Sequence, residues 1–584
     1  MKDFFKYVFA TVVGIVLTWF FAMFMFVVMM ILGLALGSAT PSVSKNSVLR
    51  IALNGDIVER AEENPIDFLM GKTEKTLTLT DIRDALKEAA TNKRVKGVYL
   101  DCGLLSTDYA IAEELHAALK AFKESGKFVV AYGDSYSQMA YYVASAADKI
   151  YLNPVGLLDW HGIASEPIFY KEMLDKIGVK MQVFKVGTYK SAVEPYMLTE
   201  MSAANREQVT AFIGDIWQHV CADVSAARNL PTDSLNAFAD RYAALTDAQN
   251  YLAWGLVDSL VYVDEVRADL RTRCDAKEVH FVEPAALASL YDESTGGDQV
   301  AVYYAEGSIV DDVSGSLTGS GGIVGSQVVS DLDALASDDD VKAVVLRINS
   351  GGGSAYASEQ MLRAVQELRK KKPVVVSMSG MAASGGYYMS CMADYIVAEP
   401  TTLTGSIGIF GVVPDVSGLM KEKLGLHFDV VKTNESADFG SMGRGFNAGE
   451  SQAMQTYVER GYSLFLQRVA EGRKLTTQQV DSIAQGRVWT GSQALAIGLV
   501  DALGGLDDAV AQAAKLAKIE KYSTIGYQNS SSWLDRFLNE KSDDYMERRL
   551  KEMLGIYYRP LQFVETLENR PSLQARIPFD PNLK

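Results

Sequence analysis

The chain carries an internal repeat, and this repeat limits the possible fold more than any other feature of the sequence. Segments 47–58 and 299–310 both show the pattern of a β-strand, a glycine turn and a second strand, 252 residues apart. The pattern of segment 95–100 recurs 246 residues later, and so does that of segment 141–154. A spacing that is shared over so long a span predicts two homologous domains joined by a short linker.

Each copy alternates expected strands with expected amphipathic helices. Such alternation is typical of a parallel sheet with crossover helices, which places an active site at the carboxyl ends of the strands. With 584 residues, 48% of them hydrophobic, the chain is long enough for two such α/β domains. The expected helices are 81–90, 111–123 and 358–370, and the expected strands are 97–100, 127–132 and 374–376, after which small residues and glycine should turn the chain.

The N-terminal segment 7–36 is apolar and carries no charged residue. It exceeds the roughly 20 residues that a helix needs to cross a bilayer, and it is longer than the apolar core of a cleavable signal. We therefore expect a retained anchor, although the small residues 37–39 leave cleavage open. Lys2 and Lys6 precede the segment, so the positive-inside rule places the N-terminus in the cytoplasm and the remainder outside.

These patterns divide the chain into five expected parts. The C-terminal part has apolar residues at helical spacing among many charges, which predicts a helix for packing or assembly. The parts are a cytoplasmic stub with the anchor (1–46), a first α/β repeat (47–280), a linker (281–298), a second α/β repeat (299–525) and a helical tail (526–584).

Several classes of function are disfavoured by composition and motifs. The net charge is −17 and no basic stripe with interleaved aromatic residues occurs, so we expect no nucleic-acid partner. The four cysteines form no CxxC pair and the five histidines no HExxH motif, so neither a disulfide framework nor a metal site is expected. The glycines at 351–353 lack the Gly-Lys-Ser/Thr of a phosphate loop, and no dinucleotide fingerprint is present, so we expect no cofactor.

Ser384 is the first candidate for chemistry, because it lies where an expected strand and turn meet an expected helix. The first turn of a helix offers unpaired N–H groups and the positive end of the helix dipole, and both stabilise a developing oxyanion. A serine between alanine and glycine is also an ordinary N-cap, so its position alone does not distinguish nucleophile from cap.

The two copies differ in the residues that a serine enzyme needs. Opposite Ser384 the first copy has Gln138, and it lacks the glycines of 349–354. The first copy instead carries Lys190, at a place where the second copy has no lysine. A loop lysine is usually a solvated surface residue, but this complementary loss suggests that one half supplies a nucleophile and the other a base. A lysine can act as the base if burial lowers its pKa to roughly 7–8.

The motifs at 187–192, 349–354, 383–387 and 403–408, in this order and behind an N-terminal anchor, resemble the signal peptide peptidase A family in its long, duplicated protease IV form. The resemblance covers nearly the whole chain. It implies tandem ClpP/crotonase-like domains and a serine endopeptidase with a Ser/Lys dyad.

By this resemblance Ser384 is the nucleophile, Lys190 is the general base, and Ser406 orients the lysine. The backbone N–H groups of Gly352 and Gly385 would form the oxyanion hole. The family often has proline where this chain has Gly351, so the choice between Gly352 and its neighbour Gly353 stays open.

The resemblance further implies a homotetramer on the outer (periplasmic) face of the cytoplasmic membrane that hydrolyses cleaved signal peptides and other unfolded apolar peptides. An extended substrate would pair with strand edges near the site. Two alternatives remain open at this point. One is a catalytically silent membrane scaffold of the same fold, and the other is a crotonase-like acyl-CoA enzyme, against which an extracytoplasmic site argues because CoA is scarce there.

Overall fold

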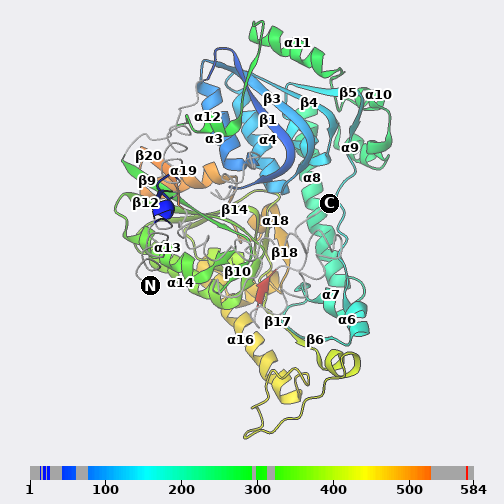
Figure 1. The fold of residues 1–584 in the computed structure, drawn as a ribbon, viewed down its shortest axis with the longest axis vertical. Helices are drawn as coiled ribbons and strands as arrows, with labels where there is room; N and C mark the ends of the chain where they lie inside the picture. Colours follow the sequence, from blue (N-terminus) through cyan, green and yellow to red (C-terminus); the bar gives the residue numbers. More distant parts are fainter. Residues whose placement is uncertain are drawn as a thin grey trace, which may run out of the picture.

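The computed structural model describes residues 14, 17–21, 23–25, 43–60, 77–291, 297–311, 322–527 and 574–576. Within these residues the chain forms two α/β halves, the first at the top of Figure 1 and the second below it. A third, smaller sheet joins strands of both halves.

The first half is built on a parallel sheet with the strand order β2-β1-β3-β4-β5-β7, and β8 also pairs with β1. Helices α3, α4 and α5 pack against one face and α11 against the other, because the strands have apolar side chains on both sides. The strands are β1 (Ser47–Val58), β2 (Leu77–Thr78), β3 (Val95–Ser106), β4 (Phe128–Tyr136), β5 (Lys149–Leu158), β7 (Ser259–Leu260) and β8 (His280–Val282). The helices are α3 (Leu79–Thr91), α4 (Tyr109–Lys123), α5 (Gln138–Ala144), α6 (Lys171–Ile177), α7 (Glu194–Met197), α8 (Ala203–Arg228), α9 (Thr232–Ala239), α10 (Ala248–Ala253), α11 (Val263–Cys274) and α12 (Pro284–Ala288).

The second half repeats this plan with the strand order β18-β16-β14-β12-β9-β20, in which only β18 runs antiparallel to its neighbour, and β15 joins β14 to β19. Strand β20 pairs with β9 as β8 pairs with β1, and helices α8 and α16 both have 26 residues. The strands are β9 (Asp298–Glu306), β12 (Val341–Ser350), β14 (Val374–Ala383), β15 (Tyr395–Ala398), β16 (Leu403–Gly405), β18 (Val488–Thr490), β19 (Ala502–Leu503) and β20 (Tyr522–Tyr527). The helices are α13 (Gly325–Ser337), α14 (Ala355–Arg369), α15 (Gly385–Ser390), α16 (Ala448–Arg473), α17 (Thr477–Ile483), α18 (Gly491–Ala496) and α19 (Leu506–Ala517).

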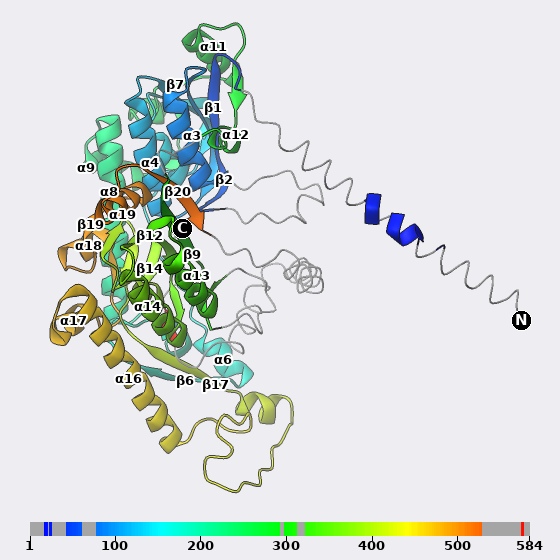
Figure 2. The ribbon, with the colours of Figure 1, turned by 90° about the vertical axis from the view of Figure 1, so that its left-hand side faces the viewer.

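The third sheet has the order β11-β10-β13-β21-β17-β6 and crosses from one half to the other. Its β6 belongs to the first repeat, and it pairs antiparallel with β17 of the second over six residue pairs. Figure 2 shows β6, β17 and α6 together at the lower end of the molecule. The strands are β6 (Lys180–Lys185), β10 (Ile309–Val310), β11 (Ile323–Val324), β13 (Gly352–Ser354), β17 (Phe410–Asp415) and β21 (Gln574–Arg576).

Two local expectations were wrong. The turn expected after residue 376 is absent, because β14 continues fully buried to Ala383. Its small residues fit against the other half: Ser379 bonds to Glu59, and a side chain at Gly380 would collide with Asp108. In the first copy, the expected strand, turn and strand of 47–58 form one strand, in which a bulge near Gly55 replaces the turn.

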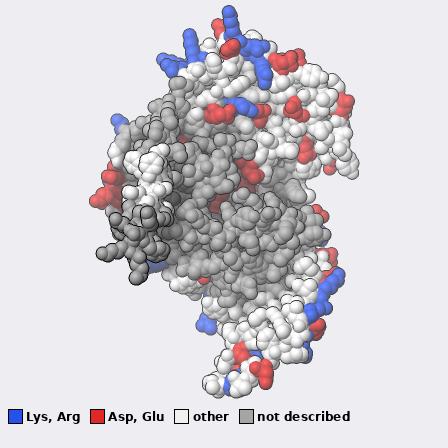
Figure 3. All heavy atoms as spheres, viewed as in Figure 1, with Lys and Arg blue, Asp and Glu red and all other residues white. Residues whose placement is uncertain are grey.

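A buried ion-pair network fixes the two halves to each other. Arg347 on β12 is 1% exposed, and it pairs with Glu59 at 2.7 Å and with Glu114 of α4 at 2.5 Å. Its Nη1 also donates to Ser377 on β14. Because an unpaired buried charge is very unfavourable, these residues hold the halves in one arrangement. On the face shown in Figure 3, acidic and basic side chains are interspersed at both ends of the molecule.

Of the expected anchor 7–36, only residues 14, 17–21 and 23–25 are described, and they are helical and exposed. No helix within the described ranges is both long enough and apolar enough to cross a membrane. Most of the tail that was expected to be helical, 526–584, falls outside the described residues, whereas its residues 574–576 form a strand.

Candidate active site

Ser384 lies at the junction between β14 and α15 and is fully buried. Its backbone has φ +56° and ψ −111°, a conformation that residues other than glycine rarely adopt. Its N–H donates to Gly405 O at 2.8 Å, which ties the turn to β16. The hydroxyl makes no capping bond to the helix, so the ordinary N-cap interpretation does not account for this serine.

Lys190 approaches Ser384 from the first repeat and is also fully buried. Its Nζ lies 2.8 Å from Ser384 Oγ, 3.0 Å from Ser406 Oγ and 2.9 Å from Ser406 O. Burial lowers the pKa of the Lys190 ammonium well below its usual value, since a charged amine is disfavoured away from water. The neutral amine can therefore accept the proton of the neighbouring hydroxyl.

The lysine reaches this place because the third sheet carries its loop across. The pairing of β6 with β17 brings Lys185 opposite Phe410, and the chain then turns into the site. The segment 485–487 of the second repeat covers the loop: Tyr189 N–H donates to Gln485 O at 2.8 Å. A Cβ at Gly486 would lie 2.5 Å from Lys190 Cβ, so only glycine fits against the lysine there.

The candidate oxyanion donors lie next to each other. Gly385 begins α15, so its N–H has no acceptor within that helix. An added Cβ on Gly385 would be 3.1 Å from Gly352 Cα, which shows how closely the glycine loop approaches. Gly352 has φ +94°, and its N–H donates to Ser350 Oγ at 3.1 Å. An oxyanion bound by Gly352 would therefore have to replace this hydroxyl.

The structure thus brings together all five residues that the sequence nominated: Ser384, Lys190, Ser406, Gly352 and Gly385. Sequence reasoning missed segment 485–487, because these residues carry no reactive group. The one signal there was an isolated glycine in the run Gln485-Gly486-Arg487.

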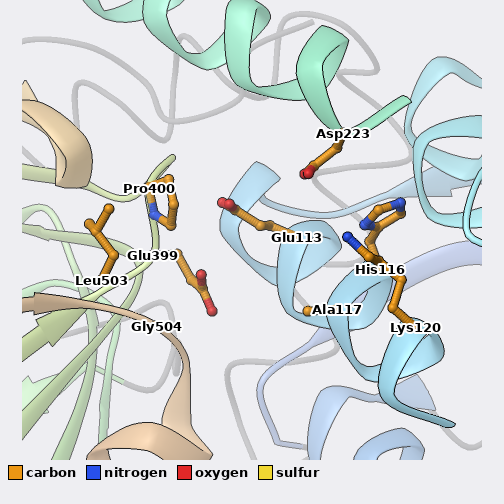
Figure 4. Close-up of a pocket in the computed structure, with 9 residues that line it drawn as sticks. All are labelled: Glu113, His116, Ala117, Lys120, Asp223, Glu399, Pro400, Leu503 and Gly504. Carbon is orange, nitrogen blue, oxygen red and sulfur yellow. The ribbon is translucent and has the colours of Figure 1, made fainter. Parts of the chain in front are cut away.

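A hollow lies between the halves, away from Ser384, with a cavity volume of about 250 Å³. Figure 4 shows Glu113 and His116 on α4, Asp223 on α8, and Glu399 from the second repeat around it. Burial, and then the neighbouring carboxylates, raise the pKa of Glu399 well above its usual value. Within the described residues no group of side chains is suited to hold a metal ion, and this hollow contains none of the five nominated residues.

The chain belongs to Peptidase family S49. The family's sequence profile matches twice, over residues 121–277 and 366–520, once in each half. A CoA-ligase profile matches residues 295–398 within the second half.

Curated relatives match over most of the chain. Protease 4 of Salmonella typhi is 41% identical over 477 residues, which cover 79% of this chain and 76% of the relative. Protease 4 of Haemophilus influenzae is 35% identical, and the match covers 85% of this chain and 83% of the relative. The chloroplastic serine protease SPPA of Arabidopsis thaliana is 31% identical, and the match covers 82% of this chain and 70% of the relative. Among solved structures, a mutant of ClpP1 from Listeria monocytogenes aligns with a TM-score of 0.25 and 16% identity, covering 36% of this chain and 94% of its own.

Proposed function

We propose that the protein is a serine endopeptidase in which Ser384 is the nucleophile and Lys190 the general base. The observation that carries the proposal is the 2.8 Å contact between Lys190 Nζ and Ser384 Oγ in a buried site. A lysine that is kept neutral by burial activates a serine without a histidine. The Lys190 amine donates to Ser406 O and to Ser406 Oγ, and these two bonds orient it.

The reaction follows from these positions. The Lys190 amine takes the Ser384 proton as Oγ attacks the substrate carbonyl carbon. The N–H groups of Gly385 and Gly352 stabilise the resulting oxyanion. The Lys190 ammonium then gives its proton to the departing amine and leaves an acyl-enzyme ester. A water molecule, deprotonated by Lys190, attacks the ester, and Ser384 recovers its proton as the acid product leaves.

The proposed substrates are cleaved signal peptides and other unfolded apolar peptides. The supporting feature is that nucleophile and base are both fully buried, so a folded protein has no access to them. We propose that segment 7–36 anchors the chain in the cytoplasmic membrane as a single span, with the catalytic part on the periplasmic side, as the charge asymmetry around the segment indicates.

We also propose assembly into a homotetramer, the number of subunits coming from the family resemblance. Residues 427–432 of the second repeat correspond to β6 of the first, at the same spacing that relates Gly425 to Gly178, both of which have positive φ. In the first repeat β6 pairs with β17, whereas residues 427–432 extend from the lower end of the body (Figures 1 and 2). The segment exposes three apolar side chains, Phe428, Val430 and Val431, the last at 99%, which suits a contact with another copy.

Labelling by a fluorophosphonate, followed together with cleavage of an unfolded peptide, tests the proposal. Wild type should label and cleave, and Ser384→Ala and Lys190→Ala should lose both signals while they remain folded. Lys185→Ala, a matched control on β6, should keep both signals. Labelling that survives Ser384→Ala would place the nucleophile elsewhere. A folded wild type without either signal would favour the scaffold.

A further inference from the structure

Strand β21, the short red strand in Figure 1, comes from the C-terminal end of the chain and fills the space between β13 and β17. It runs antiparallel to β13, with Arg576 opposite Gly352 and Gln574 opposite Ser354. On its other side Gln574 is opposite Phe410 of β17. A segment far along the chain therefore pairs with two strand edges at once.

Both edges belong to the candidate active site. Strand β13 begins at Gly352, one of the proposed oxyanion donors. Strand β17 pairs with β6, which leads into the loop of Lys190. Cα atoms of β21 also come within 8 Å of those of α15, the helix that follows Ser384. Any peptide that occupies this gap lies beside the nucleophile and the base.

The gap has the dimensions of one extended peptide. Neighbouring strands lie about 4.8 Å apart, so two edges that share one strand between them are separated by roughly 10 Å. The N–H and C=O groups along both edges need partners, and an extended chain supplies them whatever its side chains are. The edges of β13 and β17 thus form a binding site for a peptide backbone.

The direction of β21 is compatible with that of a substrate. Its chain runs from the position opposite Ser354 to the position opposite Gly352, that is, toward the proposed oxyanion donors. A substrate bound in the same direction would lay the residues before its scissile bond along β13 and bring its carbonyl to those donors. Pro571 and Pro578 flank the strand and, having no N–H group, restrict the pairing to the few residues between them.

We infer that the C-terminal segment around 574–576 is a ligand of this active site, and that it binds between β13 and β17 as a substrate-like strand in competition with incoming peptides. The inference rests on the proposed function only in taking this gap as the substrate site. It gives the C-terminal part of the chain a definite task, namely to lower the rate at which the site accepts peptides.

The first test uses full-length variants. Ala575→Pro removes an N–H group in the middle of β21, where both neighbours are strands, and should raise the rate of fluorophosphonate labelling several-fold. Leu583→Pro, a matched change outside the strand, should leave the rate unchanged. Equal rates for wild type and Ala575→Pro would overturn the inference. A slower rate in a folded Ala575→Pro would also overturn it, because β21 would then be a required part of the sheet.

The second test does not depend on hydrolysis. A fluorescent synthetic peptide of residues 568–584 should bind Ala575→Pro measurably more tightly than wild type by anisotropy, and it should do so equally with Ser384→Ala added. Excess unlabelled peptide should slow the labelling of wild type. If the peptide binds in this way but no variant labels or cleaves, the proposed hydrolysis is wrong, while the binding of the C-terminal segment between β13 and β17 is supported. If the peptide binds neither protein, the proposed binding of the C-terminal segment is wrong.

Discussion

A serine directly precedes α5 in the first repeat and α15 in the second, and the two repeats use these serines in opposite ways. At the spacing of 246 residues Ser137 lies one position before the residue that is opposite Ser384. In the first repeat Ser137 has an ordinary φ of −67°, and its Oγ accepts from Ala140 N–H at 3.3 Å and from Leu105 N–H at 3.0 Å. In the second repeat Ser384 has φ +56°, caps nothing and contacts Lys190. A hydroxyl that is engaged in capping holds the fold together, whereas one that is excluded from capping is left for chemistry.

The next residue of the first repeat completes the contrast. The Gln138 amide accepts from the N–H groups of His161 and Gly162 at 2.9 Å each, and it donates to Gly162 O at 2.9 Å. Gly162 corresponds to Gly408, which in the second repeat borders the Lys190 side chain. The first repeat therefore fixes this loop with a side-chain amide, where the second leaves space for a lysine from the other half.

The largest expected effect separates the two serines. Ser384→Ala should lower kcat by about 10⁶-fold and abolish fluorophosphonate labelling, because the attacking atom is removed. Ser137→Ala should keep kcat within about two-fold, since its hydroxyl serves only the fold. Steady-state peptide cleavage measures both. Comparable losses in the two variants would mean that the repeats do not differ as their geometry indicates.

Lys190→Met should come next, with a fall in kcat of about 10³-fold, because the general base is lost while the buried volume is kept. In wild type, activity should rise with pH as Lys190 loses its proton, and the midpoint should lie well below 10.5, since burial lowers the pKa of this amine. The pH profile of kcat measures this. A midpoint near the ordinary lysine value would show that the base is not desolvated.

Ser406→Ala should lower kcat by about 10²-fold with little change in KM. The lysine keeps its bond to Ser406 O but loses the hydroxyl 3.0 Å from Nζ that fixes its direction. Thr404→Val is a useful control, because its hydroxyl bonds to Ala382 O on the neighbouring strand rather than to the lysine. Equal losses in kcat for both variants would assign Ser406 a packing role only.

Gln138→Ala should reduce the free energy of unfolding by about 1–3 kcal/mol, because three partly buried backbone groups lose their partner, and it should leave kcat almost unchanged. Ser137→Ala should cost about 1 kcal/mol through the lost cap. Urea denaturation measures both. A loss of kcat as large as that of Ser406→Ala would instead give the first repeat a part in the chemistry.

The smallest effect concerns how stability depends on pH. The folded-state pKa of Lys190 is below its unfolded value, so the unfolded chain binds more protons between the two values, and stability rises with pH across that window. The loss of stability caused by burying the Lys190 ammonium is fully present below the folded-state pKa, and it is gone above the unfolded-state pKa of about 10.4. Lys190→Met should remove up to about 1.4 kcal/mol per pH unit from this slope. Denaturation at several pH values within that window tests it, and an unchanged slope would contradict it.

The two-fold plan could be predicted because it leaves local signals in the sequence, and comparison of the two copies nominated Ser384 and Lys190. Strand and helix periodicities repeated at one spacing, and Ser384, Lys190 and the glycine loop each stood out where the copies differ. The extension of β14 to Ala383 was not predictable, because serines and glycine are rarely strand formers. Here Ser379 bonds to Glu59, and Gly380 leaves room for Asp108, both of the other half. Such contacts depend on how the halves pack.

Segment 485–487, which packs over the loop of Lys190, was not predicted for a similar reason. Gln485 contributes a backbone carbonyl and Gly486 contributes only space, and neither property marks a residue in a sequence. Strand β21 was missed because its three residues, Gln574 to Arg576, have no strand-like alternation, and two neighbouring edges define their conformation. Backbone partners of this kind become visible only in three dimensions.

The pairing of β6 with β17 also determines when activity can first arise during synthesis. The half that carries Lys190 leaves the ribosome first, and at that stage it contains no nucleophile. Ser384 follows nearly two hundred residues later, and the segment that encloses the lysine, 485–487, later still. In the proposed mechanism a nascent chain therefore stays inactive until almost all of it has been made. Joining the two halves in one polypeptide would thus delay proteolysis until synthesis is nearly complete, and it would provide one base for every nucleophile.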